Sequence, residues 1–396
     1  MKVAIPKERR EGETRLAATP ETVKKLVGLG LEVTVEAGAG AGAFIADAAL
    51  EAAGAKLAKG AKATVEGADI VLKVRAPTPA EVKGYKSGAT LVAIMNPYRE
   101  ADTIAACAAA GVDAFAMELL PRITRAQTMD VLSSQANLAG YKAVIDAAAT
   151  FARAMPMMMT AAGTVAPAKV FIMGAGVAGL QAIATARRLG AVVSATDVRP
   201  VAREQVQSLG ATFVMVESEE TKAAETSGGY AREMSEDYKR RQAELISETI
   251  KKQDIVICTA LIPGRPAPLL VSEEQVRSMK PGSVIVDLAV EQGGNCALSQ
   301  PGKVVEVDGV TIMGHLNVPG RIAVDATSLY AKNLLNFLSP LIDKETKALK
   351  IDLGDEILKA TCLTHAGEVV HPQFKEAAAA AAAAAQGAPP AEEGGE

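Results

Sequence analysis

Short runs of β-branched and other apolar residues alternate with longer stretches of helical periodicity along most of the chain. This alternation predicts an α/β fold with parallel sheets and helices on both faces of each sheet. The first series of expected strands comprises Lys2–Ile5, Glu32–Glu36, Ile70–Val74, Thr90–Ile94 and Val112–Phe115. The second series comprises Lys169–Met173, Ala191–Thr196, Thr212–Val216, Ile255–Thr259, Val284–Leu288 and Val310–Met313. Because it has six strands with intervening helices, the second series predicts one doubly wound domain.

Two helical segments set the expected domain boundaries. Apolar residues at helical spacing predict a long connecting helix over 134–155 and a later helix over 326–338, which we expect to return and pack on the N-terminal domain. The prediction is therefore two Rossmann-like domains with parallel sheets and a nucleotide cleft between them. One domain would consist of 1–138 with 322–374, and the other of 139–321.

The composition and charge exclude several classes of protein. Of the 396 residues, 49% are hydrophobic and 22% are charged, which is typical of a soluble globular protein rather than a disordered one. The formal net charge of −4 can be assigned to residues 376–396, where four glutamates occur without a Lys, Arg or Asp. The remaining body is formally neutral, so it lacks the basic surface that nucleic-acid binding requires. We expect the Ala-, Gly-, Pro- and Glu-rich segment 375–396 to be a flexible tail, with a local helix as the alternative because alanine favours helices.

Neither a membrane span nor a disulfide framework is predicted. The most apolar region, 151–186, is interrupted by Arg153, Pro156, Pro167 and Lys169. The four cysteines are far apart and form no C-x-x-C pair, and the first residues open directly into a strand without a secretory signal. We therefore expect a soluble cytoplasmic protein in a reduced compartment, without direct membrane insertion.

The segment from Gly174 to Gly179, Gly-Ala-Gly-Val-Ala-Gly, matches the dinucleotide-binding pattern G-x-G-x-x-G. An expected strand precedes it and an expected helix follows it, which is the context that the pattern requires. Gly174 would permit a tight turn, Gly176 a close approach of the backbone to a pyrophosphate, and Gly179 close packing of the helix on the strand. Val177 and Ala178 belong to the same motif, and the N-terminus of the helix expected over Leu180–Leu189 would face the phosphate charge.

Asp197 ends the next expected strand, 18 residues after Gly179. A carboxylate at this point accepts hydrogen bonds from the adenosine ribose and repels a 2′-phosphate, so the sequence favours NAD(H) over NADP(H). The following residues are Val198 and Arg199, and an arginine near this position can instead receive a 2′-phosphate. NAD(H) remains the expected cofactor.

A dehydrogenase that acts on an alcohol or amine needs a general acid or base as well as a hydride acceptor. The chain has three histidines, all late in the sequence, of which His315 follows the last strand of the second domain. A loop-end histidine satisfied by backbone is the favoured interpretation of His315, and a catalytic acid or base is the alternative. Arg15 and Lys73 are candidates for a substrate carboxylate or Schiff-base-like chemistry, and either could equally be a surface charge.

The richest polar cluster precedes the long connecting helix. Arg122, Arg125, Gln127 and Asp130 lie within nine residues, and Ser133 follows them. These donors and acceptors suit the carboxamide and ribose of a nicotinamide nucleotide. A salt-bridged helix entry explains the same residues equally well.

A second polar stretch, 217–244, lies between two strands of the second series and contains Gly-Gly-Tyr230. On composition alone a plain surface insertion is the favoured interpretation. The alternative is a mobile surface loop that leads into a helix around 235–252.

Five segments together resemble the family of alanine dehydrogenases and proton-translocating NAD(P) transhydrogenases, and within it the NAD(H)-binding transhydrogenase component. They are Arg122–Val144, Gly174–Gly179, Thr196–Arg199, Val286–Ala289 and Glu291–Asn295. The opening Ile-Pro-Lys-Glu at 5–8, with Arg15 and the Thr-Pro pair at 19–20, fits the same family. The resemblance covers about residues 1–374, and the loop 122–130 is its most specific motif.

The resemblance implies roles for several residues. The nicotinamide and its ribose would be surrounded by Arg122, Gln127, Asp130 and Ser133, with Gln127 closest to the site of hydride transfer. Asp197 would bind the adenosine ribose. Tyr230 would be the tip of a loop that closes over bound nucleotide.

Arg15 and Lys73 match the pyruvate site of alanine dehydrogenase, but Asn96 stands where that enzyme has a histidine. The missing acid or base favours hydride transfer between two nicotinamide rings, which moves no proton at the reacting carbon, and leaves Arg15 and Lys73 as inherited structure. An alanine dehydrogenase-like amino-acid dehydrogenase and a nucleotide-binding regulatory module without turnover are the alternatives.

A transhydrogenase component implies partners as well as a cofactor. NAD(H) would bind to this chain and NADP(H) to a partner component, and a membrane partner would couple hydride transfer to proton translocation. The chain would form a homodimer, for which the small residues Ala139 and Gly140 offer a close-packing surface. It would be cytoplasmic and lie at the inner face of the bacterial cytoplasmic membrane through its partner subunits, without binding nucleic acid.

Overall fold

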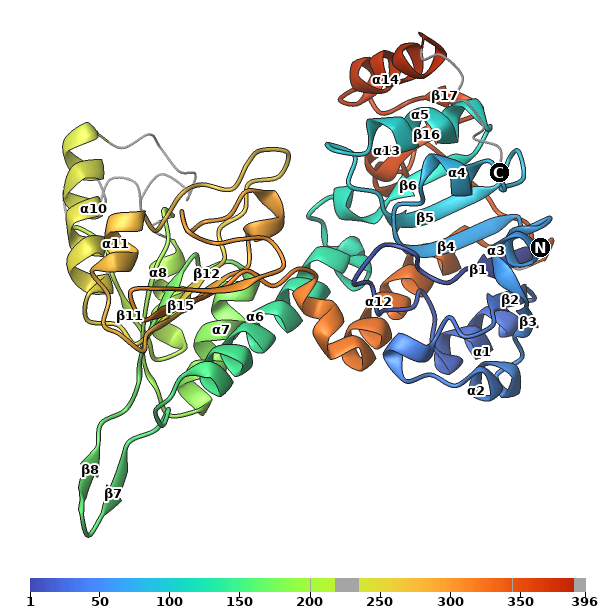
Figure 1. The fold of residues 1–396 in the computed structure, drawn as a ribbon. Coiled ribbons are helices and arrows are strands. Elements are labelled where there is room, and N and C mark those ends of the chain that lie inside the picture. Colours follow the sequence, from blue (N-terminus) through green and yellow to red (C-terminus); the bar gives the residue numbers. More distant parts are fainter. Residues whose placement is uncertain (200, 218–234, 344, 388–396) are drawn as a thin grey trace, which may run out of the picture. The chain divides into compact units, whose positions relative to one another are not determined.

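The structure is a computed structural model that describes residues 1–199, 201–217, 235–343 and 345–387. The chain divides into two compact units (Figure 1). Unit 1 comprises Met1–Gln135 and Ala323–Glu396, and unit 2 comprises Ala136–Ile322. The chain therefore passes between units at 135/136 and 322/323, whereas the sequence placed these points at 138/139 and 321/322.

An eight-stranded sheet forms the centre of unit 1, in the order β17-β16-β6-β5-β4-β1-β2-β3. The strands are β1 (Lys2–Ile5), β2 (Glu32–Glu36), β3 (Lys56–Ala58), β4 (Ile70–Arg75), β5 (Thr90–Ile94), β6 (Asp113–Ala116), β16 (Cys362–His365) and β17 (Glu368–Val369). The strands from β3 to β6 run parallel, whereas β16 is antiparallel to β6 and β17 to β16. Read from β3, the parallel strands follow the order 3-2-1-4-5-6 of a doubly wound fold.

Helices pack on both faces of this sheet because alternate strand residues point to opposite sides. The helices are α1 (Pro20–Gly28), α2 (Asp47–Ala52), α3 (Gly60–Val65), α4 (Pro79–Val82), α5 (Ala101–Ala109), α12 (Ala323–Leu338), α13 (Glu356–Thr361) and α14 (Lys375–Gly387). On one face Ile5 belongs to the same hydrophobic cluster as Leu334 of α12. On the other face Val71 clusters with Ile104 of α5.

Helix α14 lies where the sequence predicted a flexible tail. Its Ala378 is 1% exposed and belongs to the same hydrophobic cluster as Ile104 and Cys107 of α5. The local helix that the sequence allowed as the alternative is therefore present over residues 375–387. Alanine has the highest helix propensity, and its small side chain allows α14 to approach α5 closely.

A seven-stranded sheet forms the centre of unit 2, in the order β11-β10-β9-β12-β13-β15-β14. The strands are β9 (Lys169–Met173), β10 (Val192–Thr196), β11 (Thr212–Phe213), β12 (Ile255–Cys258), β13 (Val284–Asp287), β14 (Val304–Val307) and β15 (Val310–Met313). Neighbouring strands are parallel except β14, which is antiparallel to β15. The order from β11 to β15 is again 3-2-1-4-5-6, which confirms the doubly wound domain predicted from the second series.

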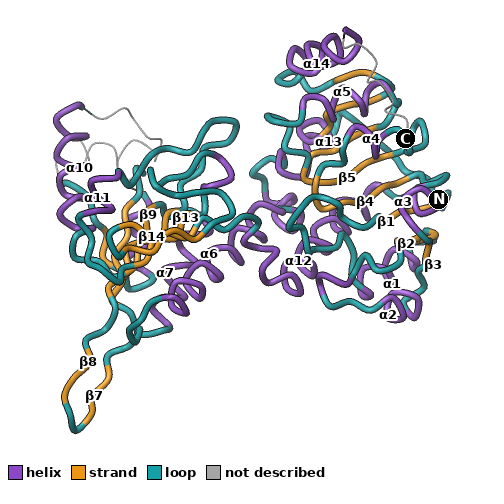
Figure 2. Tube along the Cα trace, viewed as in Figure 1, coloured by secondary structure: helices purple, strands orange, loops and turns teal. Residues whose placement is uncertain are grey.

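Unit 2 also contains a hairpin that the sequence did not predict. Its strands β7 (Met158–Thr160) and β8 (Gly163–Val165) pair antiparallel and project from the rest of the unit (Figure 1; Figure 2). The remaining helices are α6 (Val131–Thr150), which begins in unit 1, α7 (Val177–Arg188), α8 (Ala202–Ser208), α10 (Glu236–Ile250) and α11 (Glu273–Arg277). The sequence predicts 134–155 for α6, but the helix begins at Val131, directly after Asp130, and ends at Thr150.

Helices α6 and α7 approach each other very closely in unit 2. A Cβ atom at Gly140 of α6 would lie 2.0 Å from the carbonyl oxygen of Ala178 in α7. Ala139 is also buried, at 8% exposure. The small residues that the sequence offered for contact between two copies are therefore used for packing within one chain.

Candidate functional site

The turn after β9 has the geometry that the glycine pattern predicts. Gly174 has a φ of +107°, which residues with a side chain rarely adopt. A Cβ at Gly179 would lie 1.8 Å from the carbonyl oxygen of Gly174, so only glycine lets α7 pack this closely on the turn. A Cβ at Gly176, by contrast, would meet no atom within 4 Å. The space at Gly176 is therefore open to a ligand.

Helix α7 begins directly at this turn. Gly176 is its N-cap residue, and no side-chain hydrogen bond caps the helix. The first N–H groups of a helix have no partner within the helix, and the positive end of the helix dipole attracts anions. With Val177 and Ala178 in its first turn, α7 offers N–H donors to a phosphate group next to the open space.

Asp197 follows β10 and is hydrogen-bonded to the glycine turn. Its carboxylate accepts hydrogen bonds from the N–H groups of Ala175 (2.7 Å) and Arg199 (2.9 Å). The Arg199 guanidinium donates to both carboxylate oxygens, from Nε at 2.9 Å and from Nη2 at 3.0 Å. Burial raises the pKa of Asp197, but the hydrogen bonds from Arg199 and Ala175 outweigh burial and hold this pKa below its ordinary value. The carboxylate is therefore ionised at neutral pH and suited to accept hydrogen bonds from ribose hydroxyls.

A cavity of about 580 Å³ opens beside Asp197 within unit 2. It is lined by the ends of β9 and β10, by α10 and by the loop after β12, and its polar lining residues include Thr196, Asp197, Tyr238, Lys239 and Gln242. The strand order reverses between β9 and β12. Ligands of doubly wound sheets bind at this reversal, outside the carboxyl ends of the strands. The cavity therefore lies where a nucleotide binds in such folds.

Two side chains without a role predicted from their sequence pattern support this site: Thr259, directly after β12, and Asn295, in the loop after β13. The hydroxyl of Thr259 donates to the carbonyl oxygen of Gly174 at 3.0 Å. The amide of Asn295 accepts from the N–H of Ala260 (3.0 Å) and donates to the carbonyl oxygens of Ala260 (2.9 Å) and Pro268 (2.8 Å). Asn295 therefore fixes the loop that lines the cavity.

Asp287 is fully buried and fixes Asn295 in turn. Its carboxylate accepts hydrogen bonds from the N–H groups of Ala289 (2.9 Å), Asn295 (2.8 Å) and Cys296 (3.0 Å) and from the Ser299 hydroxyl (2.7 Å). These four donors satisfy the buried carboxylate within its own loop, so we assign Asp287 a structural role. Asp287 and Asn295 occur in two of the segments that carried the family resemblance, which was the only sequence signal for them.

In unit 1 the structure brings Asp130 and Ser133 together at the start of α6. One oxygen of Asp130 accepts a hydrogen bond from the Ser133 N–H at 2.9 Å, and the other accepts from the Ser133 hydroxyl. Arg122 and Gln127 are exposed, and no side-chain hydrogen bond or ion pair joins either one to another described residue. Their donors are therefore open to a ligand.

Arg125 behaves differently from these two residues. Its guanidinium pairs with Asp355 at 2.6 Å and with Glu356 at 3.5 Å. The salt-bridged helix entry that the sequence left open therefore explains Arg125, and it leaves Arg122 and Gln127 unexplained.

The strand-order reversal of unit 1, between β1 and β4, is occupied by buried ion pairs. Lys73 of β4 is 1% exposed and lies 3.1 Å from Glu81 and 3.4 Å from Glu8. Arg15 is 4% exposed and donates to both oxygens of Glu13, at 2.8 and 2.7 Å. Neither residue is a surface charge, and both have internal partners.

Two further positions bear on acid or base chemistry. Asn96 is exposed, with a φ of +48°, and its backbone N–H donates to Glu118. His315 is half-buried in unit 2, and burial, together with the charge of Arg321, lowers its pKa. A neutral imidazole can accept a proton, so the structural and the catalytic interpretation of His315 both stay predictions.

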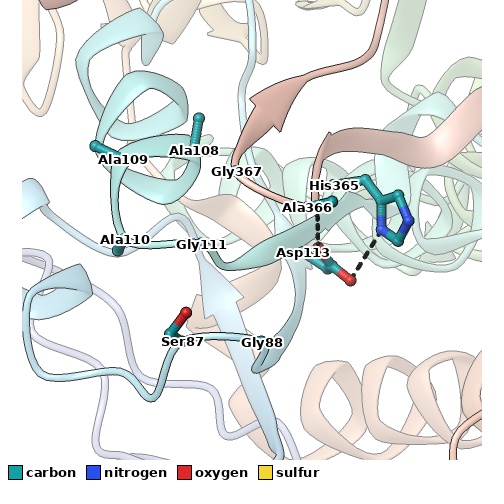
Figure 3. Close-up of a pocket in the computed structure, with 10 residues that line it drawn as sticks. All are labelled: Ser87, Gly88, Ala108, Ala109, Ala110, Gly111, Asp113, His365, Ala366 and Gly367. Carbon is teal, nitrogen blue, oxygen red and sulfur yellow. Dashed lines mark hydrogen bonds and ion pairs between the residues drawn. The ribbon is translucent and has the colours of Figure 1, made fainter.

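A second hollow lies in unit 1 at the opposite end of the strands. It is formed by the turns before β5 and β6 and by the β16–β17 turn (Figure 3). Asp113 accepts hydrogen bonds there from His365 Nδ1 and from the N–H of Ala366, both at 3.0 Å. The pair joins β16 to β6, and the hollow lies away from the carboxyl ends of the strands, where doubly wound folds bind ligands. We assign it a structural role.

None of the helices within the described ranges is long and apolar enough to cross a bilayer. Across these same residues no group of three or more His, Cys, Asp or Glu side chains could hold a metal ion. The four cysteines are buried free thiols. Tyr230, the expected loop tip, lies outside the described residues.

The fold and site define a class: two doubly wound units, of which the second carries a dinucleotide-type turn, an acidic residue after the next strand and a cavity at the sheet's reversal point. Comparison with protein families matches the N-terminal domain of alanine dehydrogenase/PNT to residues 4–139 and the C-terminal domain to residues 143–372. The chain belongs to the alanine dehydrogenase/PNT family.

Individual relatives agree with this assignment. The chain is 59% identical over 377 residues to an NAD(P) transhydrogenase alpha subunit chain of Rhodospirillum rubrum, covering 94% of this chain and 98% of the relative. A crystal structure of transhydrogenase from Sinorhizobium meliloti superimposes with a TM-score of 0.85 and 59% identity, covering 93% of this chain and all of that one. Alanine dehydrogenase of Halomonas elongata is 30% identical over 384 residues, covering 95% of this chain and 96% of the relative. These relatives are oxidoreductases, and the higher identity is to the transhydrogenases.

Proposed function

We propose that this chain is the NAD(H)-binding component of a transhydrogenase, in which a hydride passes between NAD(H) on this chain and NADP(H) on a partner component. The observation that carries the proposal is the cavity beside the ionised Asp197, next to a glycine turn with open space and uncapped helix N–H groups. The 59% identity to chains named as transhydrogenase supports this reaction over amino-acid oxidation.

The nucleotide would use the unit 2 features in sequence along its length. The adenosine would lie in the cavity, with its ribose hydroxyls on Asp197, and the pyrophosphate at Gly176 and the N-terminus of α7. Val198 and the Asp197–Arg199 pair would border the ribose. Because Arg199 is already engaged with both oxygens of Asp197, a 2′-phosphate would meet the carboxylate together with the arginine, which favours NAD(H).

By the family resemblance, the nicotinamide would be bound by residues of the polar loop 122–130 and by Ser133. Gln127 and Arg122 have exposed donors that can orient the carboxamide and the ribose, and the Asp130–Ser133 pair can fix the ribose hydroxyls. Bound NADH supplies the hydride with its two electrons from C4 and becomes NAD⁺, while NADP⁺ on the partner becomes NADPH. No proton moves at the reacting carbon, so the side chains need only to position the ring and exclude water.

The state of Arg15 weighs against the amino-acid dehydrogenase alternative. A substrate carboxylate would have to compete with Glu13, which already accepts two hydrogen bonds from the buried guanidinium. Lys73 is similarly engaged by Glu8 and Glu81. The structure therefore supports the interpretation of both cations as inherited structure.

The assembly is included in the proposal. A membrane partner would couple hydride transfer to proton translocation and hold this chain at the inner face of the bacterial cytoplasmic membrane. A homodimer would give apolar surface of the β7–β8 hairpin a partner, because Met157, Met158 and Met159 are 59%, 43% and 80% exposed. The family resemblance would also give Tyr230 a role in nucleotide binding.

One assay separates the candidate functions. The purified chain is mixed with NADH, first with pyruvate and ammonium, and then with a transhydrogenase NADP-binding component and an NADP⁺ analogue. We expect hydride transfer only in the second mixture. Turnover with pyruvate would establish the amino-acid dehydrogenase instead, and NADH binding without turnover in either mixture would indicate a regulatory module.

The same assay tests the role of Gln127. We expect Gln127→Asn to slow hydride transfer by roughly 10- to 100-fold, because a shorter amide displaces the ring from the reactive geometry. The Kd for NADH, measured by titration, should change far less. An equal loss of transfer rate and of affinity would show that Gln127 only binds.

A further inference from the structure

Helix α12 is hydrogen-bonded to the 3-10 turn η3 (Thr124–Met129), which carries Gln127. The carbonyl oxygen of Thr128, the residue after Gln127, accepts two hydrogen bonds. One comes from Nδ2 of Asn333 at 2.8 Å and the other from Nδ2 of Asn336 at 2.9 Å. Both asparagines belong to α12, so this helix fixes the backbone directly beside Gln127.

Asn333 also fixes the other end of the same segment. Its Oδ1 accepts a hydrogen bond from the hydroxyl of Ser134 at 2.8 Å. Asn333 is only 7% exposed, so both hydrogen bonds are shielded from water. Asp130 and Ser133 lie between Thr128 and Ser134, and the amide of Asn333 therefore spans the segment that holds them.

A network of buried hydrogen bonds around Gln135 also holds the start of α6 against α12. Gln135 donates from Nε2 to the carbonyl oxygen of Ala326 in α12 at 3.1 Å, and its Oε1 accepts from Nη1 of Arg15 at 2.9 Å. Arg15 is in turn held by Glu13. Nε2 of Gln135 also donates to the Ser134 hydroxyl at 3.3 Å, so hydrogen bonds connect Arg15 through Gln135 and Ser134 to Asn333 and the η3 turn.

The chemistry at position 333 requires an amide. One end of the side chain must donate to a carbonyl oxygen while the other accepts from a hydroxyl, and only an amide of this length does both. An aspartate of the same shape would direct a carboxylate oxygen at the Thr128 carbonyl. An alanine would leave the Thr128 carbonyl with the hydrogen bond from Asn336 alone.

We propose that Asn333 is a positioning residue for hydride transfer, which holds the η3 turn and the start of α6 so that Gln127, Asp130 and Ser133 keep one geometry. The inference rests on the proposed function of the chain. It concerns a residue 205 positions away in sequence from the carbonyl that it binds. Asn333 touches no reacting atom and acts through the loop.

The test measures kcat for hydride transfer and Kd for NADH in the full chain with its NADP-binding partner. Asn333→Ala and Asn333→Asp are expected to lower kcat by roughly 10- to 100-fold, because a displacement of about 1 Å has that effect on a reacting geometry. The Kd for NADH should change by less than about twofold. In a Gln127→Asn background, Asn333→Ala should add less than about a further twofold loss, because the two residues then act as one unit.

Tyr330→Phe is the matched control on the same helix. It removes a buried hydrogen bond from the tyrosine hydroxyl to the Lys73 carbonyl oxygen (2.8 Å) and leaves η3 untouched. It should lower the Tm as Asn333→Ala does, with kcat unchanged. Should Asn333→Ala not fold, Ser134→Ala removes the second partner of the same amide and carries the same expectation.

The outcomes are distinguishable. If the wild-type chain transfers hydride and the Asn333 variants keep its kcat, or lose no more than Tyr330→Phe does, the positioning role is overturned. Additive losses from Asn333→Ala and Gln127→Asn would also overturn it. If the wild-type chain transfers no hydride to any NADP-binding partner, the proposed function fails first, and this inference fails with it.

Discussion

At the scale of single residues, the three glycines of the dinucleotide turn meet three different physical demands. Gly174 supplies a backbone conformation, with φ at +107°. Gly179 supplies contact, because its missing Cβ allows the helix to touch the turn. Gly176 supplies empty space, because nothing in the chain occupies the position of its Cβ. We therefore expect Gly174 and Gly179 to be required for folding, and Gly176 to be required for ligand binding.

This difference predicts that an alanine at Gly179 lowers the stability of the fold, whereas an alanine at Gly176 mainly weakens NADH binding. Gly179→Ala should lower the free energy of unfolding by about 2–3 kcal/mol, because the new methyl group collides with backbone. Gly176→Ala should cost no more than about 1 kcal/mol, the preference of a helix N-cap for glycine over alanine. Its main effect should be at least about tenfold weaker NADH binding. Denaturant unfolding and NADH titration check the pair, and a Gly176→Ala variant that binds NADH normally would remove the pyrophosphate from this position.

Sequence alone identified those residues whose role follows from local pattern. Asp197 was predictable because it ends the strand after a glycine fingerprint. The pairing of Asp197 with Arg199 was not predictable, because closeness in a motif does not reveal which side chains form hydrogen bonds with each other. Asn333 and Asn295 were beyond reach for a different reason: their partners are brought to them only by the fold.

At the scale of elements, the buried loop after β1 should contribute to the stability of the fold in a way that depends on pH. Burial raises the pKa of Glu13, but the hydrogen bonds and charge of Arg15, with the charge of Arg75, outweigh burial and lower this pKa to about 2 from an ordinary value of 4.5. A carboxyl group with a depressed pKa stabilises the fold fully above its unfolded-state pKa. That stabilisation is lost as the pH falls from about 4.5 towards 2.

Glu13→Gln should therefore flatten the acid limb of the stability profile. The variant should be less stable than the wild type at neutral pH, because Arg15 loses a buried charge partner. Between about pH 4.5 and 2 its free energy of unfolding should fall less steeply than that of the wild type. Denaturant titrations across this range measure both slopes. Equal slopes would mean that Glu13 ionises in the folded protein as it does in the unfolded chain.

Helix α14 gives a second prediction at this scale. Ala378 is buried against α5, whereas Ala379, the next residue, is exposed. Ala378→Asp should detach the helix, because an unpaired charge cannot be buried in an apolar cluster. Ala379→Asp carries the same change of charge and helix propensity on the open side. Trypsin cleavage after Lys375, followed by mass spectrometry, should accelerate only in Ala378→Asp, and equal rates would show that α14 does not pack.

The elements that sequence missed share physical features. Strands β14, β16 and β17 are antiparallel additions at sheet edges, and β3 is a three-residue parallel strand at an edge. The antiparallel strands do not continue the regular strand–helix alternation on which the prediction rested. Strand β3 does continue it, but it has only three residues and none of them is fully buried, so it shows no apolar run. The polyalanine segment has propensity but no amphipathic pattern, since one residue type occupies both faces. Its packing depends on the small residues of α5, which only the fold brings against it.

At the scale of the whole molecule, the two units have the same parallel strand order and differ in how their reversal points are filled. In unit 2 this point keeps a cavity of about 580 Å³ beside an ionised aspartate. In unit 1 it is occupied by Arg15, Lys73 and their carboxylate partners. The sequence distinguished the units by the glycine fingerprint alone.

The exposed methionines of the β7–β8 hairpin make this part of unit 2 sensitive to oxidation. Thioethers are oxidised to sulfoxides, which turns a flexible apolar side chain into a polar one. Met157, Met158 and Met159 are exposed side by side, so peroxide should attack them ahead of buried methionines such as Met173 and Met313. If the proposed homodimer covers the hairpin, peptide mass mapping should show that these methionines are protected from peroxide. Dilution to the monomer should remove this protection. An assembly joined there would then weaken under oxidative stress and recover when a sulfoxide reductase restores the thioethers.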